Sequence, residues 1–282
     1  MSAFTSAPPP LRDVIASFNL RADKSLGQHF LLEPGLLGRI AAAAGDLTGL
    51  NVVEVGPGPG GLTRALLETG AAHVTAIEYD PRAVAAITAL AGFCSRLTIL
   101  QGDAMQADIP ALVPGPRAIV ANLPYNIGTP LLVRWLHEAA AYSSLTLMFQ
   151  QEVAERIAAA PDTSAYGRIS VLSQWLCEVA MQMHIPAGAF APPPKVDSAL
   201  VRLVPHAVQP SGVELRAMER LTAAAFGQRR KMLRGSLKGL GGEALLELAG
   251  IEPTRRAETL SVAEFETLMR VLLQRESGPR SS

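Results

Sequence analysis

The chain has 282 residues, of which 49% are hydrophobic and 18% charged, and its formal net charge is zero. Such a chain can bury a large core, and because single cores rarely grow beyond about 250 residues we expect two domains. The balanced charge excludes a uniformly basic protein, so any surface for nucleic acid must come from local clustering.

Cysteine usage and the absence of long apolar runs predict where the protein works. Cys94 and Cys177 lie in apolar segments without a second cysteine two or three positions away, which argues against a disulfide framework and a zinc site. The first residues contain no run of signal-peptide length, and no stretch reaches the roughly 18 apolar residues of a membrane span. We therefore expect a cytoplasmic globular protein, neither exported nor membrane-bound.

Short apolar runs alternate with alanine- and leucine-rich helical stretches over about two hundred residues, a pattern typical of a parallel α/β sheet. Prolines in the segment 186–198 exclude a helix there and predict a loop that delivers an antiparallel strand. The fold class is therefore α/β with a mixed sheet of about seven strands. The expected strands are 51–55, 73–78, 97–101, 118–122, 145–150, 178–185 and 199–204.

Beyond a linker at 205–212 the pattern changes to helices without strands, which predicts a small all-α domain. Ser261 and Glu264 form a capping box that starts the last helix. The first ten residues and the tail from 276 are expected to be disordered. The expected helices are 213–226, 228–240, 243–249 and 261–276. The expected divisions are an N-terminal arm (1–19), an α/β domain (20–205), a helical domain (206–275) and a tail (276–282).

The segment "VEVGPGPGGLTRALLE" is a strand that runs through a glycine turn into a helix. Gly56, Gly58 and Gly61 satisfy G-x-G-x-x-G, a spacing that lets backbone amides approach a ligand closely, although a plain tight turn is the alternative. Glu78 ends the next expected strand, where a carboxylate can accept both hydroxyls of a ribose. The pattern indicates a nucleoside ligand, either NAD or S-adenosylmethionine.

Two further strand ends help to choose between these ligands. Asp103 could accept a hydrogen bond from an adenine amino group, or could simply cap the next helix. The segment "NLPY" (122–125) offers hydrogen-bond acceptors and an aromatic ring where hydride transfer would need room for a nicotinamide. A dehydrogenase therefore rests on the glycine fingerprint alone.

The motifs "KSLGQHFL", "VEVGPGPG", "NLPYNI", "FAPPPKVDSALVRL" and "FGQRRKMLRGSL" occur in the order and spacing of the ribosomal RNA adenine dimethyltransferases, which this chain resembles over about residues 20 to 275. The resemblance implies a class I methyltransferase fold for 20–205, a helical RNA-binding domain for 206–275 and S-adenosylmethionine as cofactor. It implies two adjacent adenosines in the 3′-terminal hairpin of small-subunit ribosomal RNA, within a pre-30S particle, as substrate. The expected cofactor-binding residues are Gln28, His29, Leu31, Gly56, Gly58, Glu78, Asp103, Ala104 and Asn122.

The amino group of adenine is a poor nucleophile because its lone pair is delocalised into the ring, so the task is to place and polarise it. The side-chain oxygen of Asn122 and the carbonyl of Leu123 can each accept one of its N–H groups. Pro124 aims that carbonyl, and Tyr125 offers a ring for the base, unless it only packs on the sheet. By resemblance Phe190 covers the other face of the base, although composition alone makes it a core residue. We expect no metal and no covalent intermediate.

Residues 226–238 hold five cations and no carboxylate, which predicts a helix for RNA contact. On a helix, Arg230, Arg234 and Lys238 would share one face, although a merely solvated face is the alternative. Arg255 and Arg256 could widen the patch. The expected RNA-binding residues are Lys195, Arg229, Arg230, Lys231, Arg234 and Lys238.

Three alternatives to a monomeric small-subunit methyltransferase stay open at this point. One is adenine methylation of large-subunit ribosomal RNA, against which the long helical domain argues. Another is an assembly factor that binds RNA without catalysis, against which Glu78, Asp103 and "NLPY" argue. The third is the dehydrogenase named above.

Overall fold

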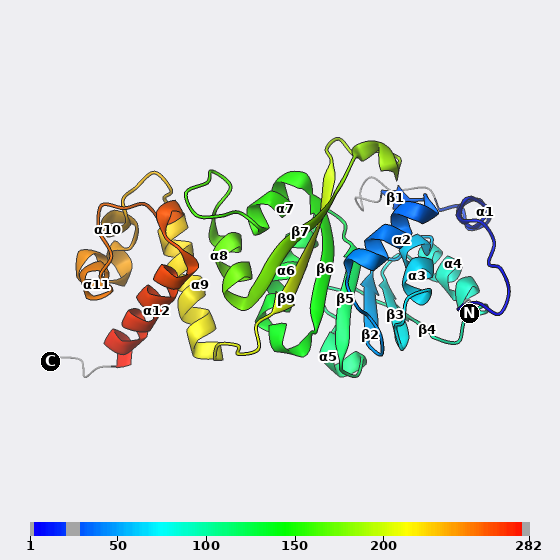
Figure 1. The fold of residues 1–282 in the computed structure, drawn as a ribbon, viewed down its shortest axis with the longest axis horizontal. Helices are drawn as coiled ribbons and strands as arrows, with labels where there is room; N and C mark the ends of the chain where they lie inside the picture. The colour runs from blue at the N-terminus through cyan, green and yellow to red at the C-terminus, as the bar shows by residue number, and fades with distance from the viewer. Residues whose placement is uncertain (1–2, 21–28, 278–282) are drawn as a thin grey trace. The chain divides into compact units, whose positions relative to one another are not determined.

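The computed structural model describes residues 3–20 and 29–277 (Figure 1). Contacts divide the chain into two compact units, one comprising 1–154 and 180–205 and the other 155–179 and 206–282. The α/β domain predicted from the sequence (20–205) instead includes residues 155–179. Within the described part of the chain, no helix has both the length and the apolar character needed to cross a membrane.

The first unit is built on a seven-stranded sheet with the order β4-β3-β2-β5-β6-β9-β7. Its strands are β2 (Asn51–Val55), β3 (His73–Glu78), β4 (Leu97–Gln101), β5 (Arg117–Asn122), β6 (Ser144–Gln150), β7 (Cys177–Ile185) and β9 (Ser198–Pro205). Each starts within one residue of the predicted strand. The neighbours from β4 through β6 pair in parallel, whereas β6 and β9 are antiparallel. The predicted mixed sheet is confirmed.

Helices occupy most of the connections between these strands. They are α1 (Leu11–Ser17), α2 (Pro34–Ala43), α3 (Gly61–Leu67), α4 (Pro81–Ala91), α5 (Ile109–Leu112), α6 (Gly128–His137) and α7 (Gln151–Ile157), with 3-10 turns η2 (Ala139–Ala141) and η3 (Ala187–Ala189). Apolar side chains of α2, α3 and α4 share one buried cluster with those of β2 and β3. Because β2, β3 and β5 are parallel, their carboxyl ends meet at one edge of the sheet.

The N-terminal arm contacts this core, although the sequence analysis expects its first ten residues to be disordered. Phe4 packs against the buried cluster, and the amide of Thr5 donates to the carbonyl of Phe93 at 2.9 Å. The guanidinium of Arg64 donates to the carbonyl of Pro9 at 2.6 Å. The expectation of disorder is therefore not met for residues 3–10.

A two-stranded antiparallel ladder joins distant parts of the first unit. In this ladder β1 (Phe30–Leu31) pairs with β8 (Phe190–Ala191), with Phe30 opposite Ala191 and Leu31 opposite Phe190. These strands have only two residues each, so their sequences carry no periodicity from which they could be predicted.

The second unit is helical. It holds α8 (Arg168–Leu176), α9 (Gly212–Phe226), α10 (Leu233–Ser236), α11 (Gly242–Leu248) and α12 (Val262–Ser277), with 3-10 turns η4 (Lys238–Leu240) and η5 (Ala257–Thr259). The predicted capping box of the last helix is confirmed, since the Glu264 carboxylate accepts from the Ser261 amide at 2.7 Å and Ser261 Oγ accepts from the Glu264 amide at 3.2 Å. Residues 276 and 277, predicted to belong to a disordered tail, instead end α12, and the remainder of that tail (278–282) lies outside the described residues.

The predicted helix over 228–240 is wrong. Helix α9 ends at Phe226, residues 227–231 form turns, and only the short α10 and η4 follow. The amide of Leu233 donates to the carbonyl of Arg255 at 2.7 Å, and Leu233 and Leu237 are fully buried. Both leucines belong to the apolar cluster of the second unit, so the break after α9 is a product of tertiary packing, which local helix propensity does not encode.

Candidate active site

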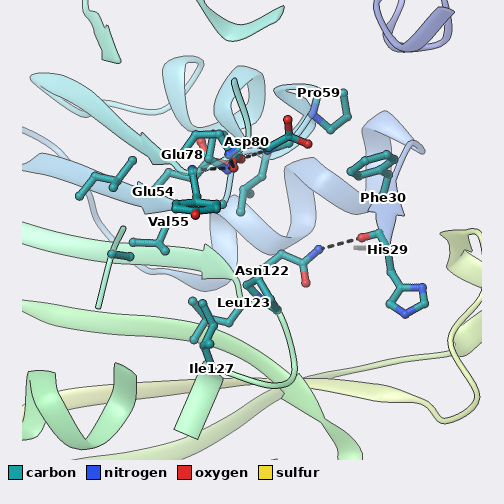
Figure 2. A pocket seen from close by; sticks show the side chains of 18 of the residues that line it. His29, Phe30, Glu54, Val55, Pro59, Glu78, Asp80, Asn122, Leu123 and Ile127 are labelled. Atoms are coloured by element: carbon teal, nitrogen blue, oxygen red, sulfur yellow. Dashed lines mark hydrogen bonds between the residues drawn. The ribbon is translucent and has the colours of Figure 1, made fainter. Parts of the chain in front are cut away.

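Most of the predicted site residues line one cavity of about 320 Å³ in the first unit, where β2, β3 and β5 end (Figure 2). Gln28 lies outside the described residues, and Phe190 does not line this cavity. The predicted residues that line it are His29, Leu31, Gly56, Gly58, Glu78, Asp103, Ala104, Asn122, Leu123, Pro124 and Tyr125.

The glycine turn forms one wall of the cavity through close backbone packing. Gly56 and Gly58 have φ values of 69° and 55°, in the left-handed region that side chains disfavour. A Cβ atom on Gly58 would lie 3.1 Å from Cε1 of Phe30. The turn therefore uses glycine both for its conformation and to let the Phe30 ring approach, which is more than a plain tight turn requires.

Two buried glutamates lie under the cavity, and both lose hydration there. Burial raises the pKa of Glu54 to about 8, although Thr63 Oγ1 donates to its carboxylate at 2.5 Å. Burial also raises the pKa of Glu78, opposed by the amides of Asp80, Gly58 and Tyr79, which donate to its carboxylate at 2.9, 3.2 and 2.8 Å. These bonds fix the Glu78 carboxylate at the end of β3. The contact predicted for this carboxylate is with the hydroxyls of a ribose.

Asp103 shapes the loop that follows β4. Its Oδ1 accepts from the amide of Met105 at 2.8 Å, and its Oδ2 accepts from Nε2 of Gln106 at 3.2 Å. The guanidinium of Arg134, on α6, donates to the carbonyls of Met105 and Ala107. Residues 104–106 form a turn, and α5 begins only at Ile109 with Asp108 as its N-cap, so Asp103 caps the turn and not the helix. The contact of Asp103 with an adenine stays a prediction.

The charge of the cavity distinguishes between the possible ligands. Four carboxyl groups line it, those of Glu54, Glu78, Asp80 and Asp103, whereas none of the described residues lining it is lysine or arginine. Asp80 pairs with the Arg82 guanidinium at 2.6 Å, and within the described residues none of the other three has an ion pair. Glu54 is protonated near pH 7 because of its raised pKa, but Glu78, Asp80 and Asp103 still give the cavity an acidic lining. Such a lining disfavours the pyrophosphate of a dinucleotide and suits a ligand with cationic sulfonium and ammonium groups. The residues therefore fit S-adenosylmethionine.

Asn122 ends β5 with its carboxamide held in one orientation. Its Nδ2 donates to the carbonyl of His29 at 3.3 Å, and Figure 2 shows that carbonyl turned toward Asn122 with the imidazole on the opposite side. No described group donates to the side-chain oxygen of Asn122, which stays available as an acceptor. Leu123, Pro124 and Tyr125 continue from it along the cavity.

Tyr125 and Phe190 differ in their surroundings. Tyr125 is half-buried, and its hydroxyl lies 2.6 Å from Oγ of Ser198. Phe190 is 4% exposed and belongs to the apolar cluster of the first unit. The prediction that Phe190 covers a base is therefore not supported by this arrangement, and the reading of Phe190 as a core residue fits it.

Comparison with known proteins decides the family. The family model for ribosomal RNA adenine dimethylase matches residues 19–274. The chain belongs to this family. It is 61% identical over 261 residues to "Ribosomal RNA small subunit methyltransferase A" of Gluconobacter oxydans, covering 92% of this chain and 86% of the relative. The protein of the same name from Mesorhizobium japonicum is 56% identical over 270 residues, covering 92% and 96%.

Solved structures support the dimethylase fold. A dimethyladenosine transferase from Plasmodium falciparum gives a TM-score of 0.74 at 26% identity, covering 88% of this chain and 98% of that one. The 23S rRNA methyltransferase ErmE gives 0.68 at 30% identity, covering 87% and 100%. The class I methyltransferase fold predicted from the resemblance is confirmed.

The cations predicted to bind RNA have different surroundings within this dimethylase. Arg229 donates from Nη2 to the carbonyls of Ser164 and Tyr166 at 3.0 and 2.6 Å, which ties it to the second unit. Arg255 pairs with Glu264. The remaining predicted cations are exposed, and their side chains have no hydrogen-bond or ion-pair partner among the described residues: Lys195, Arg230, Lys231, Arg234 and Lys238. Since 227–231 is not helical, Arg230 does not share a helix face with Arg234 and Lys238.

Several lining residues of the dimethylase cavity are absent from the sequence-based set. Phe30 packs on Gly58, Glu54 is buried below, and Tyr79, at 67% exposure, lies at the end of β3. A glutamate inside the apolar run "VEV" is a visible signal for Glu54, because an unpaired buried carboxylate is costly. Phe30 has no such signal, since its role depends on the approach of a distant glycine.

Proposed function

We propose that this protein transfers methyl groups from S-adenosylmethionine to the exocyclic amines of two adjacent adenosines in the 3′-terminal hairpin of small-subunit ribosomal RNA. Support comes from the dimethylase family, from relatives named as small-subunit methyltransferases, and from the acidic cavity. One observation carries the proposal. The Asn122 carboxamide is oriented so that its nitrogen faces the His29 carbonyl and its oxygen is free to accept an N–H.

The chain's own groups place and polarise the target amine. Asn122 Oδ1 accepts one N–H of the adenine, and the carbonyl of Leu123 accepts the other, which draws the nitrogen toward tetrahedral geometry and localises its lone pair. Tyr125 supports the ring of the base by stacking. Held in this way, the amine would present its lone pair for methyl transfer, and its surplus proton would pass to water.

The cofactor, when bound, supplies an electrophilic methyl group on a sulfonium. In this proposal Glu78 accepts the ribose hydroxyls, and Asp103 and Ala104 contact the adenine. Support comes from their position, since all three line the cavity at or just after the ends of β3 and β4. The turn at Gly56 and Gly58 and the nearby Leu31 line the same cavity and are proposed to contact the remainder of the cofactor. Among the described residues no group of three or more His, Cys, Asp or Glu side chains is arranged to hold a metal ion.

The partner proposed for the second unit is the ribosomal RNA of a pre-30S particle in the cytoplasm. The enzyme is proposed to bind it as a monomer. The exposed cations of the second unit, Arg230, Lys231, Arg234 and Lys238, support contact with phosphates. Lys195 is exposed in the first unit and is proposed as a further contact.

Large-subunit methylation is the second candidate, favoured by the likeness to the 23S rRNA methyltransferase ErmE at 30% identity. The identity of 61% to a small-subunit methyltransferase weighs against it. A non-catalytic assembly factor is disfavoured because Asn122 and Tyr125 lie together with the carboxylates of the cavity.

The decisive experiment incubates the purified protein and labelled S-adenosylmethionine with unmodified small or large subunits, and then maps any dimethyladenosine. Asn122→Ala should lower the rate at least about a hundredfold while cofactor affinity is largely retained. Asn126→Ala is the matched control, because Asn126 also lines the cavity, four residues on. Methylation of the large subunit, or full activity of Asn122→Ala, would contradict the proposal.

A further inference from the structure

We propose that the imidazole of His29 is a positioning residue for the adenine-facing wall of the site, a role separate from cofactor binding. This inference rests on the proposed function, because it concerns how the target base is received. In this inference the side chain of His29 supports Tyr125 and the segment 190–192. The backbone carbonyl of His29, by contrast, is the group that faces Asn122.

The first observation concerns the end of the β1–β8 ladder. The register places Phe30 opposite Ala191, so His29 and Pro192 are the next antiparallel pair. Pro192 has no N–H, so it cannot donate to this ladder. Nδ1 of His29 lies 2.8 Å from the carbonyl oxygen of Pro192 and must be the donor, because a carbonyl only accepts. The side chain of His29 thus adds one hydrogen bond to the end of the β1–β8 ladder, where Pro192 has no amide to donate.

The second observation concerns the two aromatic neighbours of the same ring. The centroid of the His29 ring lies 5.7 Å from that of Tyr125, with 30° between the planes. It lies 6.4 Å from the centroid of Phe190, in an edge arrangement at 79°. One imidazole therefore braces the proposed stacking tyrosine against the strand that carries Phe190.

The third observation separates this role from the cofactor. Figure 2 shows the imidazole of His29 directed away from Glu78 and Asp80, while the His29 carbonyl faces Asn122. A substitution at His29 keeps that carbonyl, so the orientation of Asn122 and the cofactor cavity can survive the loss of the ring. What is lost is the support of Tyr125, and a small misplacement of a bound substrate is enough to slow a reaction severely.

The test uses three variants of the full-length protein. His29→Ala removes both the donor and the ring, His29→Asn keeps an N–H donor for Pro192, and His29→Phe keeps a ring beside Tyr125. His73→Ala is the matched control, because His73 makes a side-chain hydrogen bond of the same length, 2.8 Å to Thr98 Oγ1, and does not line the cavity. Each protein is assayed for S-adenosylmethionine affinity, for thermal unfolding, and for single-turnover methylation of saturating unmodified small subunits.

We expect His29→Ala to methylate about tenfold more slowly or worse, with cofactor affinity within about twofold of wild type and unfolding like that of His73→Ala. His29→Asn and His29→Phe should each recover part of the rate. An unchanged rate would overturn the inference, as would a loss of cofactor affinity parallel to the loss of rate. If the wild-type protein makes no dimethyladenosine, both the proposed function and this inference are wrong. If the wild type is active and the His29 variants methylate at the same rate, only this inference is wrong.

Discussion

The hydroxyl of Tyr125 lies 2.6 Å from Oγ of Ser198. Tyr125 follows the parallel strand β5, whereas Ser198 is the first residue of the antiparallel strand β9 and is fully buried. The hydrogen bond therefore anchors the proposed stacking ring to the strand that follows the "FAPPPKVD" loop. Through this hydrogen bond, Ser198 holds the Tyr125 ring in one orientation.

A double-mutant cycle should measure this anchor. Ser198→Ala is expected to lower the free energy of unfolding by about 1 kcal/mol, the usual net value of a buried hydrogen bond, and to slow methylation. Tyr125→Phe, which keeps the ring, should cost a similar amount because it leaves the buried Ser198 hydroxyl unpaired. In urea unfolding the two losses should not add, since the double variant removes both partners. Strictly additive losses would show that the two hydroxyls do not interact.

The sheet could be predicted from the sequence because buried parallel strands are continuous apolar runs, and all seven starts agree within one residue. The strand ends then place Gly56, Glu78, Asp103 and Asn122 together by topology alone. What could not be predicted depends on tertiary contacts. The break after Phe226 follows from the burial of Leu233 and Leu237, and the two-residue ladder of Phe30 and Leu31 has no local pattern.

Glu54 should make stability depend on pH. Its pKa rises from an ordinary 4.5 to about 8 in the folded protein, so the unfolded chain releases this proton at lower pH than the native state does. Between these values the native state binds more protons, and stability must fall as the pH rises, by up to roughly 1.4 kcal/mol per pH unit. The contribution is complete below pH 4.5 and is lost by about pH 8.

Glu54→Gln removes the ionisable group while keeping an acceptor for Thr63. We expect urea unfolding of this variant to depend less on pH than that of the wild type across the same window, and the variant to gain relative stability toward pH 8. Glu152→Gln, at an exposed position of α7, is the control and should leave the profile unchanged. Parallel profiles for the wild type and Glu54→Gln would show that Glu54 is not desolvated as the structure indicates.

Gly58→Ala should harm both the fold and the cofactor cavity. Its φ of 55° is costly for any residue with a Cβ, and that atom would meet the Phe30 ring at 3.1 Å. We expect a loss of about 1–3 kcal/mol in unfolding free energy and weaker S-adenosylmethionine binding, because Phe30 must move. Gly102→Ala is a matched control in the same cavity, since its added Cβ would have no atom within 4 Å from any described residue other than its two chain neighbours. Equal effects of the two substitutions would argue against this reading of the turn.

Arg229 and Arg230 are neighbours in sequence, but replacing Arg229 should mainly lower the free energy of unfolding, and replacing Arg230 should mainly weaken RNA binding. The exposed Arg229 guanidinium donates to the carbonyls of Ser164 and Tyr166, so Arg229→Ala should destabilise the second unit by about 1 kcal/mol. Arg230 is exposed and unpartnered among the described residues, so Arg230→Ala should leave unfolding within about 0.5 kcal/mol of wild type.

In RNA binding, Arg230→Ala should have the larger effect of the two substitutions, whereas in unfolding Arg229→Ala has the larger effect. If Arg230 contacts a phosphate, Arg230→Ala reduces the slope of log affinity against log salt by about 1, because one fewer counterion is released. Arg229→Ala, measured at a temperature where the variant stays folded, should change that slope less, since its guanidinium is already held by the two carbonyls. Salt titrations of RNA binding together with urea unfolding of both variants test this division. A larger loss of slope for Arg229→Ala would mean that its guanidinium leaves those carbonyls for the RNA.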